Sequence, residues 1–383
     1  MRQGQAGTLE SNDAVITVAE APAGSGIIID LESSVKAAYG DAIEAVIRDA
    51  CREAGIEDAE VDVRDKGALD CTIRARTLTP LPAPAYKPAK GPLIMRRTLL
   101  FLPGNNPGNL QSGAVFGADG IILDLEDSVS PAEKDAARLL VASALKSVDY
   151  AGVERAVRIN TLATGGEADI AAVVPCRPDA VMLPKTESID DIRACEALLE
   201  EAEAACGAAK KTLIMPLIET PMGLARCLEI ALASKRVTLL SLGGEDYTAS
   251  LGTQRTREGR ELIFARGMLA NAAAAAGIDS IDAPFADTND PEGLFLDTQN
   301  ARTFGFKGKF AINPRQISVI HKAFAPTAKE IAWAKRILVV IEEAQKKGAG
   351  VIALDGKMVD APIVARARRT IHMADMLGLL EEE

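Results

Sequence analysis

Residues 97–126 read RTLLFLPGNNPGNLQSGAVFGADGIILDLE, and they contain two strand-like apolar runs, RTLLFL and GIILDL. Helical patterns separate these runs from similar ones further along the chain. In all, eight runs begin near Arg97, Gly120, Arg155, Ala180, Thr212, Val237, Ser280 and Gly308. Eight strand–helix units over about 220 residues predict an α/β fold, the (β/α)8 TIM barrel. An open doubly wound sheet is the alternative, since it needs no closure between the first and eighth strands.

The sequence on either side of these units predicts further parts. Residues 80–92, PLPAPAYKPAKGP, hold five prolines, which block helices and sheet ladders and favour a semi-rigid extended linker. The barrel domain then occupies residues 93–383. Helices expected over 327–347 and 359–379 form a C-terminal helical extension, residues 327–383.

Residues 1–79 predict a small α+β domain. One helix is expected where apolar residues recur at three- and four-residue spacing from Val35 to Cys51. Short apolar segments before and after it predict strands at 14–18, 27–31, 61–64 and 71–75.

Composition excludes several classes of function. The 383 residues carry 43 Lys+Arg and 54 Asp+Glu, a net charge of −11, so neither nucleic acid nor an anionic membrane is an expected partner. Two histidines are too few for most zinc sites or for Ser-His-Asp chemistry. The six cysteines form no C-x-x-C pair and are expected to be reduced thiols of a cytoplasmic protein. No run of 18 apolar residues predicts a membrane span.

In a TIM barrel the active site lies at the carboxyl ends of the strands, where this sequence has several carboxylates and no histidine. Such a set suits Mg²⁺, which takes one or two protein carboxylates and fills its other positions with water and substrate oxygens. Glu219 and Asp246, after the fifth and sixth runs, are the predicted metal pair. Helix capping is the alternative role for both. Glu245 is expected to point away, because side chains alternate along a strand.

Four basic residues stand at the starts or ends of these runs. Arg158 ends the third run, and an arginine beside a metal can bind a substrate carboxylate or enolate oxygen bidentately. A salt bridge to the acidic segment 124–127 is a compatible alternative for Arg158. Arg96 and Arg97 open the first strand, at the opposite end of the barrel, where a structural role and phosphate binding are both open. Lys185 ends the fourth run and is given no role.

Several segments of residues 93–383 resemble the β subunits of citrate lyases and, more broadly, the citramalyl- and malyl-CoA lyase superfamily. They are RRTLLFLPGNNPGNLQ, LDLEDSVSPAEKDAAR, LPKTES, LIMPLIETPMG, LGGEDYTASL, AINPRQI and DGKMVDAPIVARA. The resemblance implies Mg²⁺ held by Glu219 and Asp246, with substrate bound by Arg158. It also implies that Asp360 reaches a neighbouring subunit's site as a proton-transfer group, so that a homo-oligomer completes its active sites in trans.

The first 80 residues resemble a different subunit, the γ subunit or acyl carrier protein of citrate lyases, through AGTLESNDAVITV, LESSVKAAYGDAI and VRDKGALDCTIRAR. In that family a serine carries a covalently attached phosphoribosyl-dephospho-coenzyme A arm. Its match is Ser11, a hydroxyl expected to precede the first strand, with glycines at positions 4 and 7. The two subunits are usually separate chains. A linker between them raises the effective concentration of the arm at the barrel mouth.

Together the resemblances imply a citrate lyase γ–β fusion. Such a protein cleaves a citryl thioester, held on the carrier's arm, into oxaloacetate and an acetyl thioester, and a citrate lyase α subunit is a further candidate partner. Two alternatives stay open. One is a lyase acting on free CoA thioesters such as citramalyl-CoA or malyl-CoA, with a vestigial carrier. The other is a non-catalytic carrier or scaffold.

Overall fold

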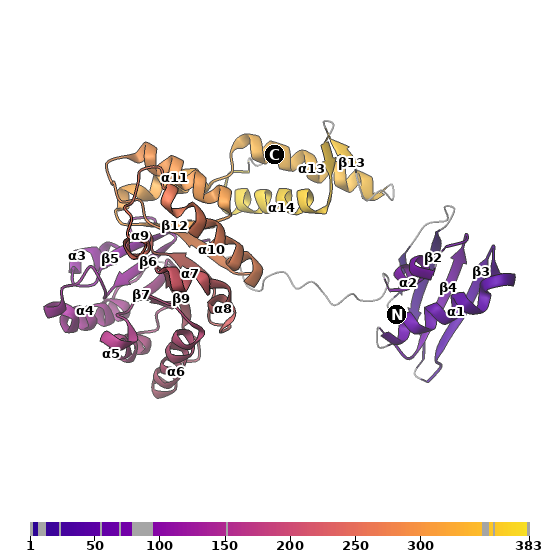
Figure 1. Cartoon of the computed structure of the whole chain (residues 1–383), viewed down its shortest axis with the longest axis horizontal. Helices are drawn as coiled ribbons and strands as arrows, with labels where there is room; N and C mark the ends of the chain where they lie inside the picture. Colours follow the sequence, from indigo (N-terminus) through magenta and orange to yellow (C-terminus); the bar gives the residue numbers. More distant parts are fainter. Residues whose placement is uncertain are drawn as a thin grey trace. The chain divides into compact units, whose positions relative to one another are not determined.

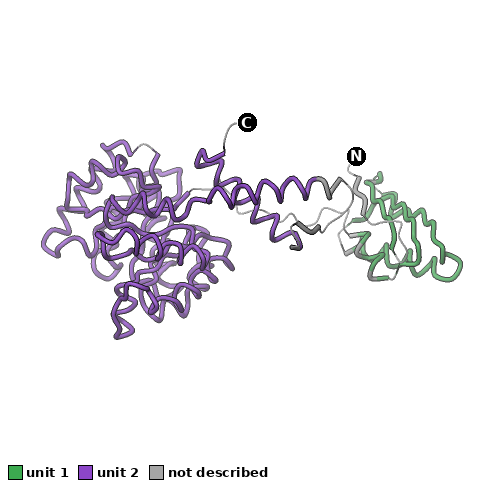
Figure 2. The backbone as a smooth tube through the Cα atoms, turned by 90° about the horizontal axis from the view of Figure 1, so that it is seen from above, with its two compact units in different colours: residues 1–90 green, residues 91–383 purple. Residues whose placement is uncertain are grey.

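The computed structural model describes residues 3–6, 13–22, 24–53, 56–68, 70–78, 95–150, 152–346, 352–354 and 357–380. The chain forms two compact units, residues 1–90 and 91–383, each with its own core (Figure 2). Ser11 and the proline-rich segment 80–92 lie outside the described residues.

The smaller unit is one mixed sheet with two helices, as its α+β pattern predicts. Its strands follow the order β1-β2-β4-β3, in which β3 and β4 are parallel and the other pairs are antiparallel. Ile16 and Val61 of the sheet pack with Ile47 of a helix in the core. The elements are β1 (Gln3–Ala6), β2 (Ala14–Glu20), β3 (Ile27–Ser33), α1 (Lys36–Glu53), β4 (Ala59–Asp65) and α2 (Asp70–Leu78).

Two details of this unit differ from expectation. The predicted strand 71–75 is wrong, because the segment lies within α2. Ile73 and Thr77 are both buried and stand four residues apart, so one helical stripe satisfies the core. Arg76 of the same helix donates two hydrogen bonds to Asp13, at 3.0 and 2.9 Å. The expectation that Ser11 precedes the first strand is also wrong, since β1 comes before it and contains Gly4.

The larger unit is a closed barrel of eight parallel strands (Figure 1). The last strand pairs with the first, Phe310 lying opposite Leu99, and this closure excludes the open doubly wound sheet. The strands are β5 (Thr98–Pro103), β6 (Gly120–Asp124), β7 (Glu154–Arg158), β8 (Ala180–Leu183), β9 (Leu213–Ile218), β10 (Leu239–Leu242), β11 (Asp279–Asp282) and β12 (Gly308–Ala311).

The strands read as apolar runs because both of their faces are covered. Side chains alternate between two separate cores. Leu99 and Ile122 point into the barrel and pack with Phe310, whereas Leu100 and Ile121 point outward beneath the helices. The layer between strands and helices is the larger of the two cores.

Helices surround the barrel, and several begin at side chains that cap them. Asn106, Ser188, Thr220 and Asp290 each accept a hydrogen bond from a backbone N–H in the first turn of a helix. The helices are α3 (Pro107–Ser112), α4 (Lys134–Ser147), α5 (Gly166–Val173), α6 (Ile189–Cys206), α7 (Pro221–Ala225), α8 (Cys227–Leu232), α9 (Gly244–Ser250), α10 (Ile263–Ala276), α11 (Pro291–Phe304) and α12 (Ile317–Phe324). Short 3₁₀ turns occur at Pro131–Glu133, Leu162–Thr164, Val174–Cys176, Arg260–Leu262 and Pro314–Gln316.

The C-terminal extension is a helical hairpin with a small core of its own. Ile337 and Ile341 pack against Val364 and Ala367, separately from the barrel cores. Figure 1 shows this hairpin projecting from the side of the barrel. Both extra helices are confirmed, and a two-stranded turn that the sequence analysis did not anticipate joins them. The elements are α13 (Ala328–Lys346), β13 (Ile352–Leu354), β14 (Lys357–Val359) and α14 (Ala361–Met376).

At the amino-terminal end of the barrel, the two arginines that immediately precede β5 have structural roles. Arg96 is buried and binds both carboxylate oxygens of Glu154, at 2.7 and 2.8 Å. Arg97 donates to both oxygens of Asp119, at 2.9 and 2.7 Å. These pairs leave neither guanidinium for phosphate. In the described part of the chain, no helix combines the length and apolar character of a membrane span.

Candidate active site

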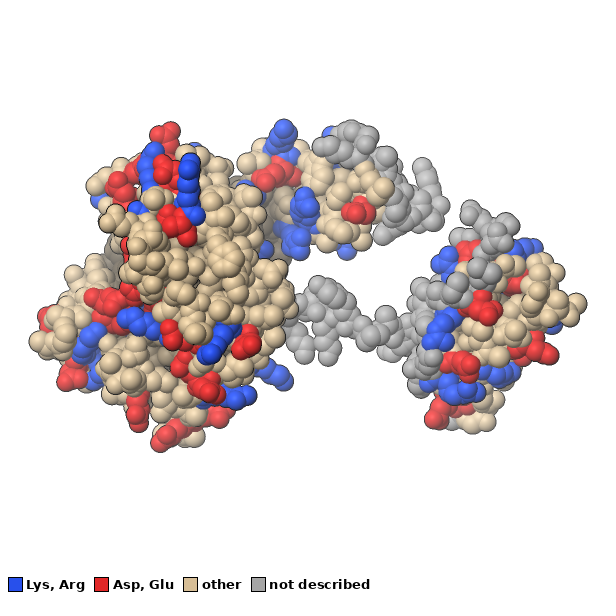
Figure 3. Space-filling view, in the orientation of Figure 1, with Lys and Arg blue, Asp and Glu red and all other residues tan. Residues whose placement is uncertain are grey.

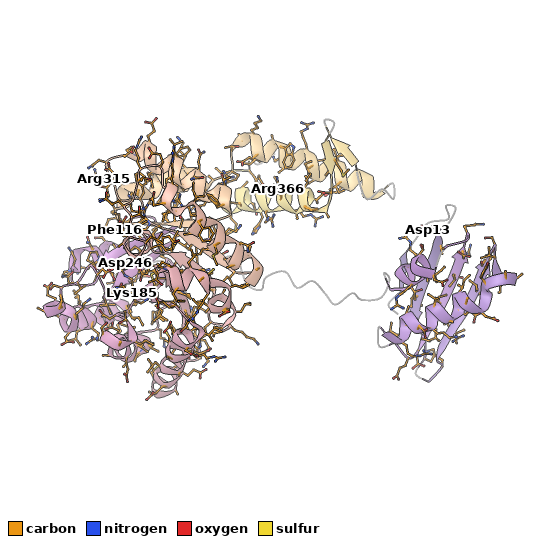
Figure 4. The ribbon with its side chains drawn as sticks, in the orientation of Figure 1. Asp13, Phe116, Lys185, Asp246, Arg315 and Arg366 are labelled. Carbon is orange, nitrogen blue, oxygen red and sulfur yellow. The ribbon has the colours of Figure 1, made fainter. Side chains whose placement is uncertain are left out.

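A pocket of about 410 Å³ opens at the carboxyl ends of the barrel strands. Its acidic walls come from four strand ends, and Figure 4 labels Asp246 and Lys185 in this part of the barrel. Asp124 and Arg158 end β6 and β7, while Glu219 and Asp246 follow β9 and β10. The structure therefore brings the predicted metal pair and the predicted substrate-binding arginine into one cavity.

Arg158 is fixed by the acidic segment that follows β6. Its Nε and Nη2 donate to the two oxygens of Asp124, both at 2.7 Å, and Nη1 lies 3.1 Å from Glu126 Oε2. The guanidinium also stacks 4.9 Å from the ring centroid of Phe101. Burial would lower the pKa of Arg158, but the carboxylates outweigh burial and raise it. The salt-bridge alternative is thus confirmed, and it leaves a permanently charged, oriented guanidinium in the wall of the pocket.

Glu219 is a buried carboxyl group, 3% exposed, that points into the same pocket. Its Oε1 accepts a 2.7 Å hydrogen bond from the backbone N–H of Lys185. Burial, aided by the charges of Glu126 and Asp246, raises the pKa of Glu219 to about 8. Gly243 makes room for it, because a Cβ there would lie 2.6 Å from Glu219 Oε2.

Asp246 and Glu245 correct a detail of the sequence analysis. Both stand in the first turn of α9 rather than on a strand, so strand alternation does not separate them, and both line the pocket. Arg255 lies 3.3 Å from Glu245 Oε1 and holds that side chain. Gly244 leaves the space that Arg255 occupies, since a Cβ there would meet its Nη1. Asp246 is therefore the acid available beside Glu219.

Two further residues at strand ends, which the sequence analysis named without giving either a role in metal or substrate binding, belong to this site. Glu126 is buried, and its Oε2 has no hydrogen-bond partner although Arg158 lies close to it. Burial raises the pKa of this carboxyl group. Lys185 carries its ammonium group 3.3 Å from Glu126 Oε1 and 3.8 Å from Asp246 Oδ2. Both residues follow apolar runs in the sequence, and that position indicates the mouth of the barrel.

The pocket fits a hard divalent cation bound with few protein ligands. Glu219 and Asp246 line a cavity with no imidazole or thiol in its walls, and the nearby Glu126 has a buried oxygen without a hydrogen-bond partner. Among the described residues no cluster of three or more acids, histidines or cysteines has the geometry of a complete metal site. Mg²⁺ needs no such cluster, since water and substrate oxygens complete its shell.

Asp360, another predicted site residue, lies away from this pocket. Asp360 is the N-cap of α14, accepting a 3.2 Å hydrogen bond from the N–H of Ile363. It belongs to the extension and does not line the pocket of its own barrel. Ser11 lies outside the described residues.

A closed (β/α)8 barrel with an arginine and several carboxylates at its mouth defines a barrel enzyme whose site handles anionic, oxygen-rich substrates. The sequence matches the HpcH/HpaI aldolase/citrate lyase family over residues 97–314, and the chain belongs to this family. Residues 1–82 match an acyl carrier family described as malonate decarboxylase delta subunit (MdcD). The chain is a carbon–carbon lyase with an acyl-carrier-like domain at its amino terminus.

Individual relatives support this assignment. The citrate lyase subunit beta of Leuconostoc mesenteroides subsp. cremoris is 45% identical over 76% of this chain and 96% of its own length. The human mitochondrial citramalyl-CoA lyase is 31% identical, over 73% of this chain and 86% of its own. The structure of CitE from Mycobacterium tuberculosis in complex with magnesium, acetoacetate and coenzyme A is 31% identical. It covers 73% of this chain and 98% of its own, with a TM-score of 0.59.

Proposed function

We propose that the chain is a γ–β fusion of citrate lyase. In this proposal residues 1–79 are the acyl carrier, 80–92 the linker and 93–383 the lyase, which cleaves a citryl thioester into oxaloacetate and an acetyl thioester. The main support for this proposal is that Glu219, Asp246 and Arg158 line one pocket. Residues 1–82 of the same chain match an acyl carrier family. The relative named citrate lyase subunit beta favours citryl over other thioesters.

The proposed reaction cleaves one carbon–carbon bond of the citryl group. The hydroxyl beside that bond becomes the ketone of oxaloacetate, and the other fragment leaves as the enolate of an acetyl thioester, which then takes up a proton. Glu219 and Asp246 would hold Mg²⁺, a Lewis acid that stabilises negative charge on the substrate's hydroxyl and ketone oxygen. A structure of a relative whose title includes magnesium supports this choice of metal.

Arg158 would bind the substrate by charge. Asp124 binds Nε and Nη2, Nη1 lies 3.1 Å from Glu126 and 3.5 Å from Asp127, and the side chain lines the pocket. A cation fixed in this way stabilises a substrate carboxylate or the enolate oxygen without reorganising during the reaction. Phe101 covers the guanidinium on one side and limits its contact with water.

Proton transfer to the enolate is assigned to Asp360 of a neighbouring copy. This proposal needs a homo-oligomer, because Asp360 belongs to an extension with its own core. The barrel offers apolar contact surface: Leu232, Phe264 and Leu296 are exposed on α8, α10 and α11. Figure 3 shows a broad area without charged side chains on the visible face of the larger unit. Such surfaces favour association between copies.

Ser11 is proposed to carry the phosphoribosyl-dephospho-coenzyme A arm, with a citrate lyase α subunit as partner in loading it. Intact mass of the native protein tests the arm directly. An adduct larger than phosphopantetheine, absent from Ser11→Ala protein, is expected. Ser11→Ala should still cleave free citryl-CoA, because the carrier and the barrel are separate units. Native protein without any adduct, when produced beside the attachment machinery, contradicts the proposed arm.

A second candidate substrate is a free CoA thioester. Relatives named citramalyl-CoA lyase and L-malyl-CoA/beta-methylmalyl-CoA lyase favour it, at 31% and 33% identity. The deciding experiment measures oxaloacetate or pyruvate release from citryl-CoA and citramalyl-CoA, with and without Mg²⁺. A higher kcat/KM for citryl-CoA supports the first proposal, and a higher value for citramalyl-CoA supports the second. Absence of metal-dependent turnover with either substrate overturns both.

A further inference from the structure

Lys185 has a backbone conformation that needs an explanation. It follows β8 and Pro184, and its φ of 50° lies in the left-handed region that non-glycine residues seldom adopt. Arg177 is the other non-glycine residue with a positive φ among those described. Such a conformation costs about 1–3 kcal/mol and persists where surrounding structure demands it. At Lys185 a hydrogen bond accounts for this conformation, because the turn directs the backbone N–H of Lys185 to the Glu219 carboxyl group.

The side chain of Lys185 enters the same acidic site from the strand end. Its Nζ lies between two carboxylates that come from different elements, 3.3 Å from Glu126 Oε1 and 3.8 Å from Asp246 Oδ2. Lys185 therefore orients the Glu219 carboxyl group through its own backbone N–H, and its ammonium group offsets the charges of Glu126 and Asp246.

The Lys185 side chain is held less tightly than that of Arg158. Arg158 is locked by two 2.7 Å hydrogen bonds to Asp124, and its side chain is only 12% exposed. The Lys185 side chain is 44% exposed, and its contacts are longer. Ammonium is a compact point charge on a flexible stem, so it can leave the site without breaking a bidentate pair.

We propose that the Lys185 ammonium holds the place of a cation between Glu126 and Asp246, and that a bound divalent cation displaces it toward the rim of the pocket. The inference rests on the proposed Mg²⁺ site. Lys185 is thus a positioning residue that offsets the repulsion between these two carboxylates and competes with the metal. Its displaced ammonium is then available to an anionic group of the substrate at the pocket rim.

The test is Mg²⁺ binding to the full-length chain, measured by isothermal titration calorimetry without substrate. Lys185→Met keeps the backbone N–H that contacts Glu219 and removes the competing charge. It should tighten Mg²⁺ binding about three- to tenfold, the range expected from losing two partly exposed charge contacts. Lys185→Arg, which retains a cation, should bind Mg²⁺ no more tightly than the native chain. A structural role alone would weaken binding in both variants.

Arg315→Met is the matched control. Arg315 is exposed, follows β12 at the same end of the barrel, and donates a hydrogen bond to its neighbour Asn313. Equal tightening in Arg315→Met and Lys185→Met would overturn the proposal, because a general charge effect would then explain both. Unchanged or weaker binding in Lys185→Met overturns it as well.

A second measurement covers the case in which Lys185→Met is unstable. Lys185→Gln keeps a polar side chain, and its Mg²⁺-induced rise in Tm should exceed that of the native chain. An equal or smaller rise contradicts displacement. If the native chain itself binds no Mg²⁺, the proposed metal site fails, and this inference fails with it. If native binding is observed without tightening in the variants, only the role of Lys185 fails.

Discussion

Replacement of Lys309 by methionine should destabilise the barrel strongly, because Lys309 belongs to a fully buried set of four charges. Its Nζ contacts Asp282 at 2.5 Å and Asp297 at 2.7 Å. Arg266 binds the same two aspartates, at 2.9 and 2.7 Å. These side chains join β11, β12, α10 and α11, and the four charges sum to zero.

Lys309→Met leaves one guanidinium facing two buried carboxylates, and therefore one uncompensated negative charge. Breaking a buried pair in this way costs about 3–5 kcal/mol, a large part of the 5–15 kcal/mol typical of domain stability. For a barrel of this size the loss corresponds to a fall in Tm of roughly 6–20 °C. Urea titration and differential scanning calorimetry of the metal-free chain measure both quantities.

Lys307→Met is the matched control, since Lys307 is exposed two residues earlier in the chain. Its free energy of unfolding should change by about 0.5 kcal/mol or less. Adding Asp297→Asn to Lys309→Met restores neutrality, so the double variant should lose less stability than the two single changes summed. The reasoning is refuted if Lys309→Met unfolds within 1 kcal/mol of Lys307→Met, or if the double variant is strictly additive.

Three further predictions concern the metal, pH and assembly. Glu219→Ala and Asp246→Ala should each lower kcat/KM by about 10³ or more, since several kcal/mol of charge stabilisation is lost; full activity in verified metal-free native protein would exclude Mg²⁺. Burial and the charge of Arg97, opposed by Asp119, hold the pKa of His321 below its usual range. The folded state then binds fewer protons than the unfolded chain, so the free energy of unfolding should fall as pH drops below about 6.5. His321→Gln should reduce this slope in urea titrations, and an unchanged slope would count against the assignment. Finally, mixing inactive Asp360→Ala with inactive Glu219→Ala protein should restore part of the activity if Asp360 acts in trans; verified subunit exchange without recovery would show that it does not.

The amino-acid pattern alone determined much of this protein. Eight apolar runs separated by helical patterns predicted the barrel and its eight strand positions, because buried parallel strands must be apolar on both faces. Strand ends also predicted that Glu219, Asp246 and Arg158 would meet, since parallel strands bring their carboxyl ends to one mouth. The small domain was predicted as α+β from local periodicity, although its segment 71–75 was assigned to the wrong element.

The tertiary structure decided which side chains touch. Local pattern could not show that Lys185 turns into the left-handed region to reach Glu219, or that Arg255 holds Glu245 beside Asp246. It also could not reveal that Lys309 is buried with its counter-charges, because an isolated lysine at a strand position is ordinarily exposed. These contacts join residues far apart in the chain, and their energies depend on distance and burial. Sequence pattern specifies neither quantity until the barrel has closed.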